Sequence, residues 1–263
     1  ISSNDFANCG YNVASPSGAT TLISSAMADL NTTINNNTFT NLNITSTGSV
    51  TFISNSILVS ATGSQTIQAN SIVTGFNKGG AGGTITFCTS SSSSTAGATI
   101  LHRNNNFSNI TVTGATTIAG WASSDGGTAN KTYQNNTFSN ITGGTSAVTI
   151  MSINFGGGAG GNGNVIQSNT ITNVTGQGAV TGISVGSSAT VSSVLSNTLT
   201  NLTSTGAGGA VVGIVLGTPT SHCFSNTIGT LASSGSASAV TGISCSAGTL
   251  SNIYKNKVYD LSS

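Results

Sequence analysis

A six-residue motif recurs along this chain and constrains its fold more than any other feature. It reads Asn, any residue, an apolar residue, any residue, Asn, and a second apolar residue. The motif is clearest at Asn37–Leu42 and last occurs at Asn256–Leu261, where Asp replaces the second Asn. Successive copies begin 28 to 35 residues apart, which predicts a solenoid of stacked, similar coils. The leading residues of the eight copies are Asn37, Asn70, Asn105, Asn136, Asn169, Asn197, Asn226 and Asn256.

Alignment of the copies produces three rows of apolar residues. They lie three residues before the leading Asn and two and five residues after it, as with Ile34, Phe39 and Leu42; the degenerate second copy places Gly75 in the third row. The separations of five and three are odd, so the chain must bend between rows to bury all of them. Asn tolerates the left-handed conformation and bonds its own backbone at bends. We therefore expect the eight leading Asn residues at bends, with their side chains in a hydrogen-bonded ladder along the axis.

A further strand is expected in the second half of each coil. Aligned copies begin with Ala147–Ile153 and Ala179–Val185, and strict alternation predicts that Thr149, Met151 and Ile153 point inward. Turns rich in Gly, Ser and Thr join these strands and carry the variation in coil length. The two later copies are Ala210–Leu216 and Ala239–Cys245.

Together these patterns predict an all-β chain, a parallel β-helix with three strands per coil, about 30 residues per coil and about eight coils. Residues 31–263 form the β-helix in this interpretation, and residues 1–30 form an N-terminal cap or a first irregular coil. Apolar residues at helix-like spacing between Leu22 and Leu30 predict a short capping helix within residues 17–30. The last motif is followed by only two residues, so a further coil from another subunit could stack on it.

The stacked motifs resemble those of the right-handed parallel β-helix repeat proteins that bacteria secrete, which share the pectate-lyase-like solenoid superfold. The resemblance covers roughly residues 30–263. It implies a right-handed coil and a secreted or cell-surface location, often within a very large surface protein. It implies little about activity, because that fold hosts lyases, hydrolases, adhesins and fibres alike.

Charged residues are scarce. The 263 residues include five basic and four acidic side chains, with a net charge of +1. Nucleic-acid binding requires clustered basic side chains, so we expect no nucleic-acid partner. No apolar run approaches the roughly 20 residues of a membrane span, so none is expected. The surface must be covered mainly by neutral Ser, Thr, Asn and Gly.

The catalytic possibilities are correspondingly few. The four Asp residues are too scattered to predict the carboxylate pair of a glycoside hydrolase. Polar chemistry concentrates only at His102, Arg103, Asp125 and Lys131, within about one coil. His102 occupies an apolar row, so we expect it in the core and the charges at the surface. Trp121 and Tyr133 could stack on a sugar, but their positions favour core packing. We expect no catalytic residue, cofactor or metal.

Four cysteines have wide, irregular spacing without a CxxC pair, which argues against a zinc site. Their disulfide state stays open, because two of them could pair across neighbouring coils. Burial as small apolar side chains is the favoured interpretation. The residues are Cys9, Cys88, Cys223 and Cys245, of which the last two are the candidate pair.

Threonines recur at the two outward positions that flank the motif's first apolar residue. Neighbouring positions would form a flat grid with steps of about 7 Å within a strand and about 4.8 Å between coils. Such a grid resembles the ice-binding faces of β-solenoid antifreeze proteins, although Thr is also a favourable outward residue in any strand. The residues of this Thr face are Thr38, Thr40, Thr137, Thr170, Thr172, Thr198, Thr200 and Thr227.

Several Asn-x-Ser/Thr triplets, such as Asn109-Ile110-Thr111 and Asn201-Leu202-Thr203, match N-glycosylation acceptors. In a chain this rich in Asn and Thr they are expected by chance, and several use corner Asn residues expected to turn into the coil.

We therefore expect a non-catalytic extracellular module: a surface spacer, an adhesin segment or a fibre subunit that stacks end to end with itself. Two alternatives stay open. The first is ice binding through the Thr face. The second is polysaccharide binding or cleavage, for which Lys131 or Arg103 would be essential.

Overall fold

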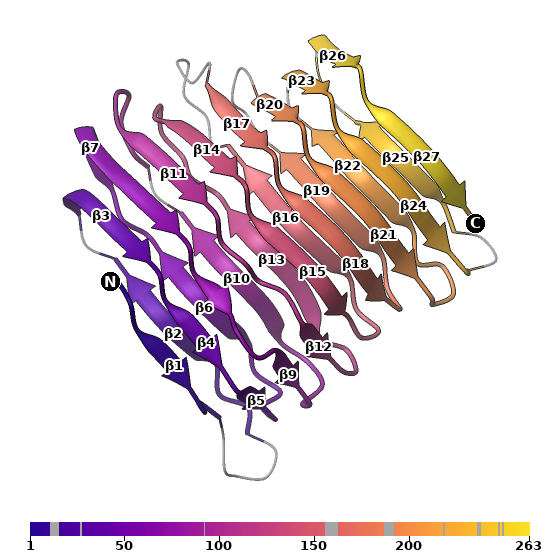
Figure 1. Cartoon of the computed structure of the whole chain (residues 1–263), viewed down its shortest axis with the longest axis horizontal. Helices are drawn as coiled ribbons and strands as arrows, with labels where there is room; N and C mark the ends of the chain where they lie inside the picture. Colours follow the sequence, from indigo (N-terminus) through magenta and orange to yellow (C-terminus); the bar gives the residue numbers. More distant parts are fainter. Residues whose placement is uncertain are drawn as a thin grey trace.

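The computed structural model describes residues 1–10, 16–26, 28–91, 93–155, 163–186, 192–217, 219–235, 238–246, 248 and 250–263. The described chain is a parallel β-helix of about eight turns, and these residues contain strands and no helix. Successive coils lie side by side in chain order, with the two termini at opposite ends (Figure 1). The predicted all-β fold with three strands per coil is confirmed.

Three parallel sheets of eight strands run along the axis, and each coil contributes one strand to each sheet. Sheet A contains β3 (Asp29–Asn35), β7 (Val59–Gln68), β11 (Thr99–Arg103), β14 (Asn130–Gln134), β17 (Asn164–Gln167), β20 (Ser192–Leu195), β23 (Thr220–Phe224) and β26 (Leu250–Tyr254). Sheet B contains β5 (Leu42–Ile44), β9 (Phe76–Lys78), β12 (Ile110–Val112), β15 (Thr137–Thr142), β18 (Thr170–Gly176), β21 (Thr198–Ser204), β24 (Thr227–Ser233) and β27 (Lys257–Ser262).

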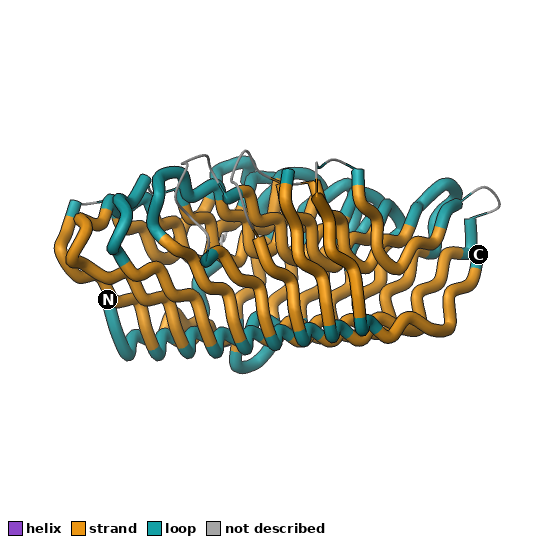
Figure 2. Tube along the Cα trace, turned by 90° about the horizontal axis from the view of Figure 1, so that it is seen from above, coloured by secondary structure: helices purple, strands orange, loops and turns teal. Residues whose placement is uncertain are grey.

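Sheet C contains β2 (Thr20–Ser25), β6 (Val50–Asn55), β10 (Thr84–Ser90), β13 (Thr117–Ser123), β16 (Val148–Asn154), β19 (Val180–Gly186), β22 (Val211–Gly217) and β25 (Val240–Cys245). A short fourth sheet contains β1 (Asp5–Ala7), β4 (Thr38–Thr40) and β8 (Ser71–Ile72). Figure 2 shows the strands of successive coils stacked in parallel along the rod.

The interior is filled by the apolar rows that the motif predicts. Ile34 pairs with Ile67, and Phe138 pairs with Ile171, in the expected register. One position differs: Phe76 rather than Gly75 pairs with Leu42 in the third row. The second coil has one extra residue at this bend, and Gly75 accommodates it at a φ of 91°.

The inward face of sheet C differs from strict alternation. In β16, Val148 and Ile150 are buried and Thr149 points outward, whereas Met151 directly after Ile150 is buried again. Two consecutive inward residues, Ile150 and Met151, indicate a local irregularity in the strand. Met151 and Ile153 point inward as expected, but the expected inward position of Thr149 was wrong.

The N-terminal region belongs to the solenoid. The capping helix expected within residues 17–30 is not formed, because Thr20–Ser25 is strand β2 and pairs in parallel with β6. Before it, β1 pairs in parallel with β4. The segment Asn4–Cys9 is a further copy of the motif, 33 residues before Asn37, with Cys9 as its final apolar residue.

Aromatic side chains pack against one another in the core between residues 87 and 138. Phe87 stacks on Phe107 at 5.4 Å between ring centroids and on Phe138 at 5.9 Å, and Phe107 meets Trp121 edge to face. All four are fully buried. Among the described residues no helix is long and apolar enough to cross a membrane.

Candidate functional site

The leading Asn residues form a continuous hydrogen-bonded ladder inside the coil, here called the inner ladder. From Asn4 to Asn226, each side-chain amide donates to the side-chain oxygen of the leading Asn in the next coil, at 2.8–3.0 Å. The same oxygen also accepts the backbone N–H of the preceding Asn at 2.9–3.1 Å. The ladder consists of the eight predicted residues, Asn37 to Asn256, and of Asn4, which sequence reasoning missed.

The bend beside the inner ladder depends on a different residue from the one expected. The residue immediately before each leading Asn has positive φ, for example 55° at Asn135 and 53° at Ser168. The leading Asn residues themselves do not. This geometry turns the Asn side chain inward, where Asn136 and Asn169 are each only 1% exposed. The second Asn of the motif does adopt the left-handed conformation that Asn tolerates, as at Asn140 with a φ of 55°.

These second Asn residues form another ladder on the outer surface, here called the outer ladder. Asn140 donates to Asn109 at 3.0 Å, Asn173 to Asn140 at 3.1 Å, and Asn201 to Asn173 at 2.9 Å. All four side chains are exposed, so the triplets that begin at Asn109 and Asn201 carry an outward and not an inward Asn.

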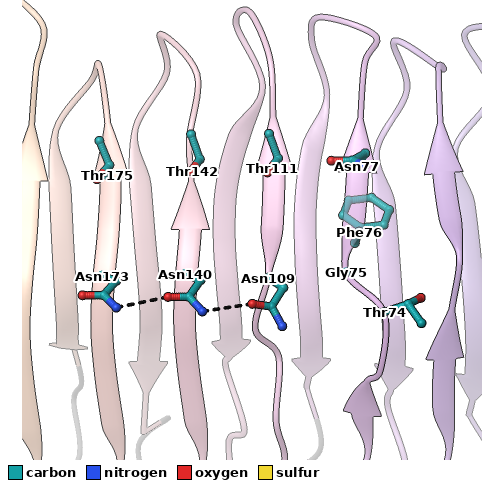
Figure 3. Close-up of a pocket in the computed structure, with 10 residues that line it drawn as sticks. All are labelled: Thr74, Gly75, Phe76, Asn77, Asn109, Thr111, Asn140, Thr142, Asn173 and Thr175. Atoms are coloured by element: carbon teal, nitrogen blue, oxygen red, sulfur yellow. Dashed lines mark hydrogen bonds between the residues drawn. The ribbon is translucent and has the colours of Figure 1, made fainter.

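A row of threonines runs parallel to the outer ladder, two residues further along each coil. Thr111 pairs with Thr142, and Thr142 pairs with Thr175, in the parallel register of sheet B. Figure 3 shows the two rows extending over three coils, with the amides linked to one another and the threonines beside them. A hollow of about 580 Å³ lies between the rows and extends to Thr74–Asn77. We call this hollow the Asn–Thr groove.

The Thr face is only partly continuous. Thr137, Thr170, Thr198 and Thr227 occupy successive registers of sheet B and are at least partly exposed. Thr172 and Thr200 share one hydrogen bond at 3.1 Å between their hydroxyl groups. Thr38 and Thr40 lie in the short sheet, where the Asp5 carboxylate accepts both hydroxyls at 2.9 Å. Along the row that starts at Thr38, Ser71 and Asn106 stand between Thr38 and Thr137 and interrupt the threonines.

The candidate catalytic cluster is divided between the inside and the outside of the coil. His102 is fully buried, in contact with Trp121 and Tyr133, which are also fully buried as expected. The Trp121 indole donates to His102 Nδ1 at 3.3 Å, so His102 Nε2 carries the proton and donates to Gln65 Oε1 at 3.0 Å. Burial lowers the pKa of His102 to about 4, against a smaller opposing effect of Asp125.

Asp125 and Lys131 were expected at the surface, and this expectation was wrong. Asp125 is fully buried and accepts hydrogen bonds from Ser90, Ser123 and Tyr133 at 2.8, 3.0 and 3.1 Å. Lys131 is 1% exposed, and its ammonium group donates to the carbonyl oxygens of Gly127 and Ala129. Internal partners satisfy both charges, so each is compatible with burial.

Arg103 lies on the other side of the same sheet. It is partly exposed in β11, and its Nε donates to Gln68 Oε1 at 2.8 Å. Its side chain is therefore separated from His102 by the backbone, since neighbouring strand residues point to opposite faces. The four residues do not converge on one solvent-accessible site.

All four cysteines are free thiols. Cys88 and Cys223 are buried, and burial raises the pKa of Cys223 to about 12. Cys9 is partly exposed and Cys245 is exposed. Cys223 and Cys245, the candidate pair, form no disulfide. Among the described residues no group of three or more His, Cys, Asp or Glu side chains could hold a metal ion.

Comparison with known proteins gives no further constraint: no protein-family model, curated protein or solved structure matches this chain.

Proposed function

We propose that this chain is a non-catalytic structural module, a stiff spacer or adhesive segment of an extracellular protein. The observation that carries the proposal is the inner ladder. It runs through every coil from Asn4 to Asn256. Neighbouring coils are therefore joined by three sheets and by a fourth, internal line of hydrogen bonds. Stacked strands with an amide ladder form assemblies that resist disruption.

The placement of the ionisable groups supports the same proposal. Lys78, His102, Asp125 and Lys131 point into the coil and bond internal partners. Acid–base catalysis requires a group within hydrogen-bond reach of a substrate, whereas these four side chains are buried inside the coil. The outer rows of sheet B instead present neutral hydroxyl and amide groups, which suit a hydrated surface.

Electron microscopy distinguishes a fibre subunit from a spacer or adhesive segment. Filaments of the purified chain would support a fibre subunit whose copies stack end to end. Discrete particles would favour a spacer or adhesive segment.

Single-molecule force spectroscopy tests the structural role directly. The chain is pulled from its two ends, and we expect it to resist extension and then to release length in steps of whole coils. An Asn169→Ala variant should unfold at lower force, because it interrupts the inner ladder. Gradual extension at low force without steps would contradict the proposed stiffness. Turnover of a polysaccharide by the unmodified chain would contradict the absence of catalysis.

Ice binding is the second candidate, and the continuous register of Thr137, Thr170, Thr198 and Thr227 favours it. Replacing Thr170 and Thr198 with Tyr would disturb this row without touching the core. If the row binds ice, thermal hysteresis is present in the unmodified chain and lost in the double variant. Equal hysteresis in both proteins would exclude this row as the binding face.

A further inference from the structure

We propose that the Asn–Thr groove binds a neutral, linear polysaccharide that lies along the axis of the rod. This inference adds a ligand to the structural role and does not depend on it. It rests on the hydrogen-bonding groups that the groove leaves free, on their rigidity, and on the absence of charge among the lining residues.

The outer ladder leaves part of every amide available. A side-chain amide has two N–H donors and two acceptor lone pairs. Asn140 uses one donor on Asn109 and accepts one hydrogen bond from Asn173. One donor and one lone pair therefore remain on it, directed away from the ladder and toward solvent. Asn173 is in the same position, because it donates to Asn140 and accepts from Asn201.

The threonine row adds a hydroxyl group per coil. The hydroxyls of Thr111, Thr142 and Thr175 make no hydrogen bond with any residue that the structure describes. Each coil thus offers one amide donor, one amide acceptor and one hydroxyl, and the same set recurs in the next coil (Figure 3). A ligand that recurs along its own length can use this set repeatedly.

The groove is held rigidly before any ligand arrives. The apolar residue between each Asn and Thr is buried, as with Ile141 between Asn140 and Thr142. The ladder bonds hold the amides at both ends, and the strand pairs of sheet B hold the threonines. Binding then requires little further ordering of side chains, which is the condition under which weak polar contacts yield measurable affinity.

The lining residues select the class of ligand. None of them is ionisable, so an anionic polymer would gain no ion pair in the groove. Coils recur at about 4.8 Å, whereas an extended peptide advances by about 3.3 Å per residue and soon loses register. A sugar unit in an extended polysaccharide is comparable in length to one coil and carries several hydroxyl groups. Phe76, the aromatic residue of the lining, is 1% exposed, so ring stacking is weak and we expect millimolar affinity.

Titration with short oligosaccharides tests this proposal. Cellohexaose, xylohexaose and mannohexaose are added to the isotopically labelled chain, with an oligogalacturonate as the charged comparison, and amide shifts are followed by NMR. We expect at least one neutral sugar to shift signals of Asn140, Thr142 and their neighbours with saturable binding. Saturable binding by the oligogalacturonate alone, or no binding by any neutral sugar, would overturn the proposal.

A double variant, Thr142→Val and Thr175→Val, removes two hydroxyls and preserves the strand shape. Loss of two hydrogen bonds should weaken binding about ten-fold. Thr181→Val, on the outward face of β19 in sheet C, is the matched control and should bind as the unmodified chain does. Equal affinity of the double variant and the control would overturn the groove assignment. The unfolding force of the double variant should be unchanged, so the ligand proposal can fail while the structural role survives.

Discussion

Asn169→Ala interrupts the inner ladder at its middle. The side chain of Asn169 accepts the backbone N–H and the side-chain amide of Asn136, both at 2.9 Å, and donates to Tyr133 O and Asn197 Oδ1 at 3.0 Å. Alanine leaves two buried donors of Asn136 without an acceptor. Asn197 Oδ1 still accepts the backbone N–H of residue 169. A stranded buried donor costs about 1–3 kcal/mol, so the free energy of unfolding should fall by about 4 kcal/mol.

The matched control is Asn173→Gly in β18, the strand that begins directly after Asn169. Asn173 also makes two amide–amide bonds, but it is exposed, and water replaces both. Glycine keeps the positive φ of 55° without strain. We expect a change below about 1 kcal/mol.

Equilibrium unfolding in urea measures both variants. The single tryptophan, Trp121, is fully buried and reports loss of the core by fluorescence, while circular dichroism reports loss of the sheets. A difference between the two variants of less than about 1 kcal/mol would refute the reasoning, because burial would then not decide the value of the ladder bonds.

Three further predictions concern buried groups and thiols. Gly182→Ala should lower the free energy of unfolding by about 2–4 kcal/mol, because the added Cβ would collide with Leu199 and lie 2.7 Å from Gly213 O. Gly186→Ala in the same strand has open space and should be neutral, so equal urea midpoints of the two variants would contradict this reasoning. The pKa of His102 falls from 6.5 to about 4 on folding, so between these pH values the unfolded chain binds a proton that the folded chain does not. The free energy of unfolding should therefore fall by about 3 kcal/mol as the pH is lowered from 6.5 to 4. His102→Leu should remove that pH dependence from the urea midpoint, and an unchanged slope would count against a neutral buried His102. In the native state two thiols should react with Ellman's reagent and two only after unfolding: Cys9 and Cys245 first, then Cys88 and Cys223.

The repeat predicts the coil because the spacing between motif copies equals the number of residues in one turn of the β-helix. The rows through Ile34 and Phe39 follow directly from alignment of the motif copies. The first copy, at Asn4, was missed because Cys9 stands where all the other copies except the degenerate second one have Leu, Ile or Val. The signal that could have found it was the distance of 33 residues to Asn37.

Other errors have local physical causes. The spacing of Leu22 and Leu30 suits a helix, but pairing of Thr20–Ser25 with β6 satisfies its backbone and overrides that local pattern. Thr149 was placed inside because strict alternation cannot register an irregularity in the strand. Asp125 and Lys131 were placed outside because charges rarely tolerate burial. Their internal partners are neutral residues of strands β10, β13 and β14 and of the segment before β14, and the motif does not identify them.

The outer ladder could not be predicted as a separate feature. The motif placed both Asn positions at bends, and only the φ angles distinguish them. A positive φ at Asn135 turns Asn136 inward, and a positive φ at Asn140 itself leaves that side chain outside. One motif therefore produces an internal support and an external surface from the same residue type.

The inner ladder also has a direction, and this imposes an order on folding. Every Asn-to-Asn bond of the ladder runs toward the C-terminal side, so the corner of Asn136 is completed by Asn169 of the following coil. A coil cannot satisfy its own corner during synthesis, because the acceptor that it needs has not yet emerged. A chain that folds from its N-terminus therefore carries one incomplete corner at a time, always in its newest coil. The donors of that corner select the next Asn and set its register, so each coil acts as the template for its successor.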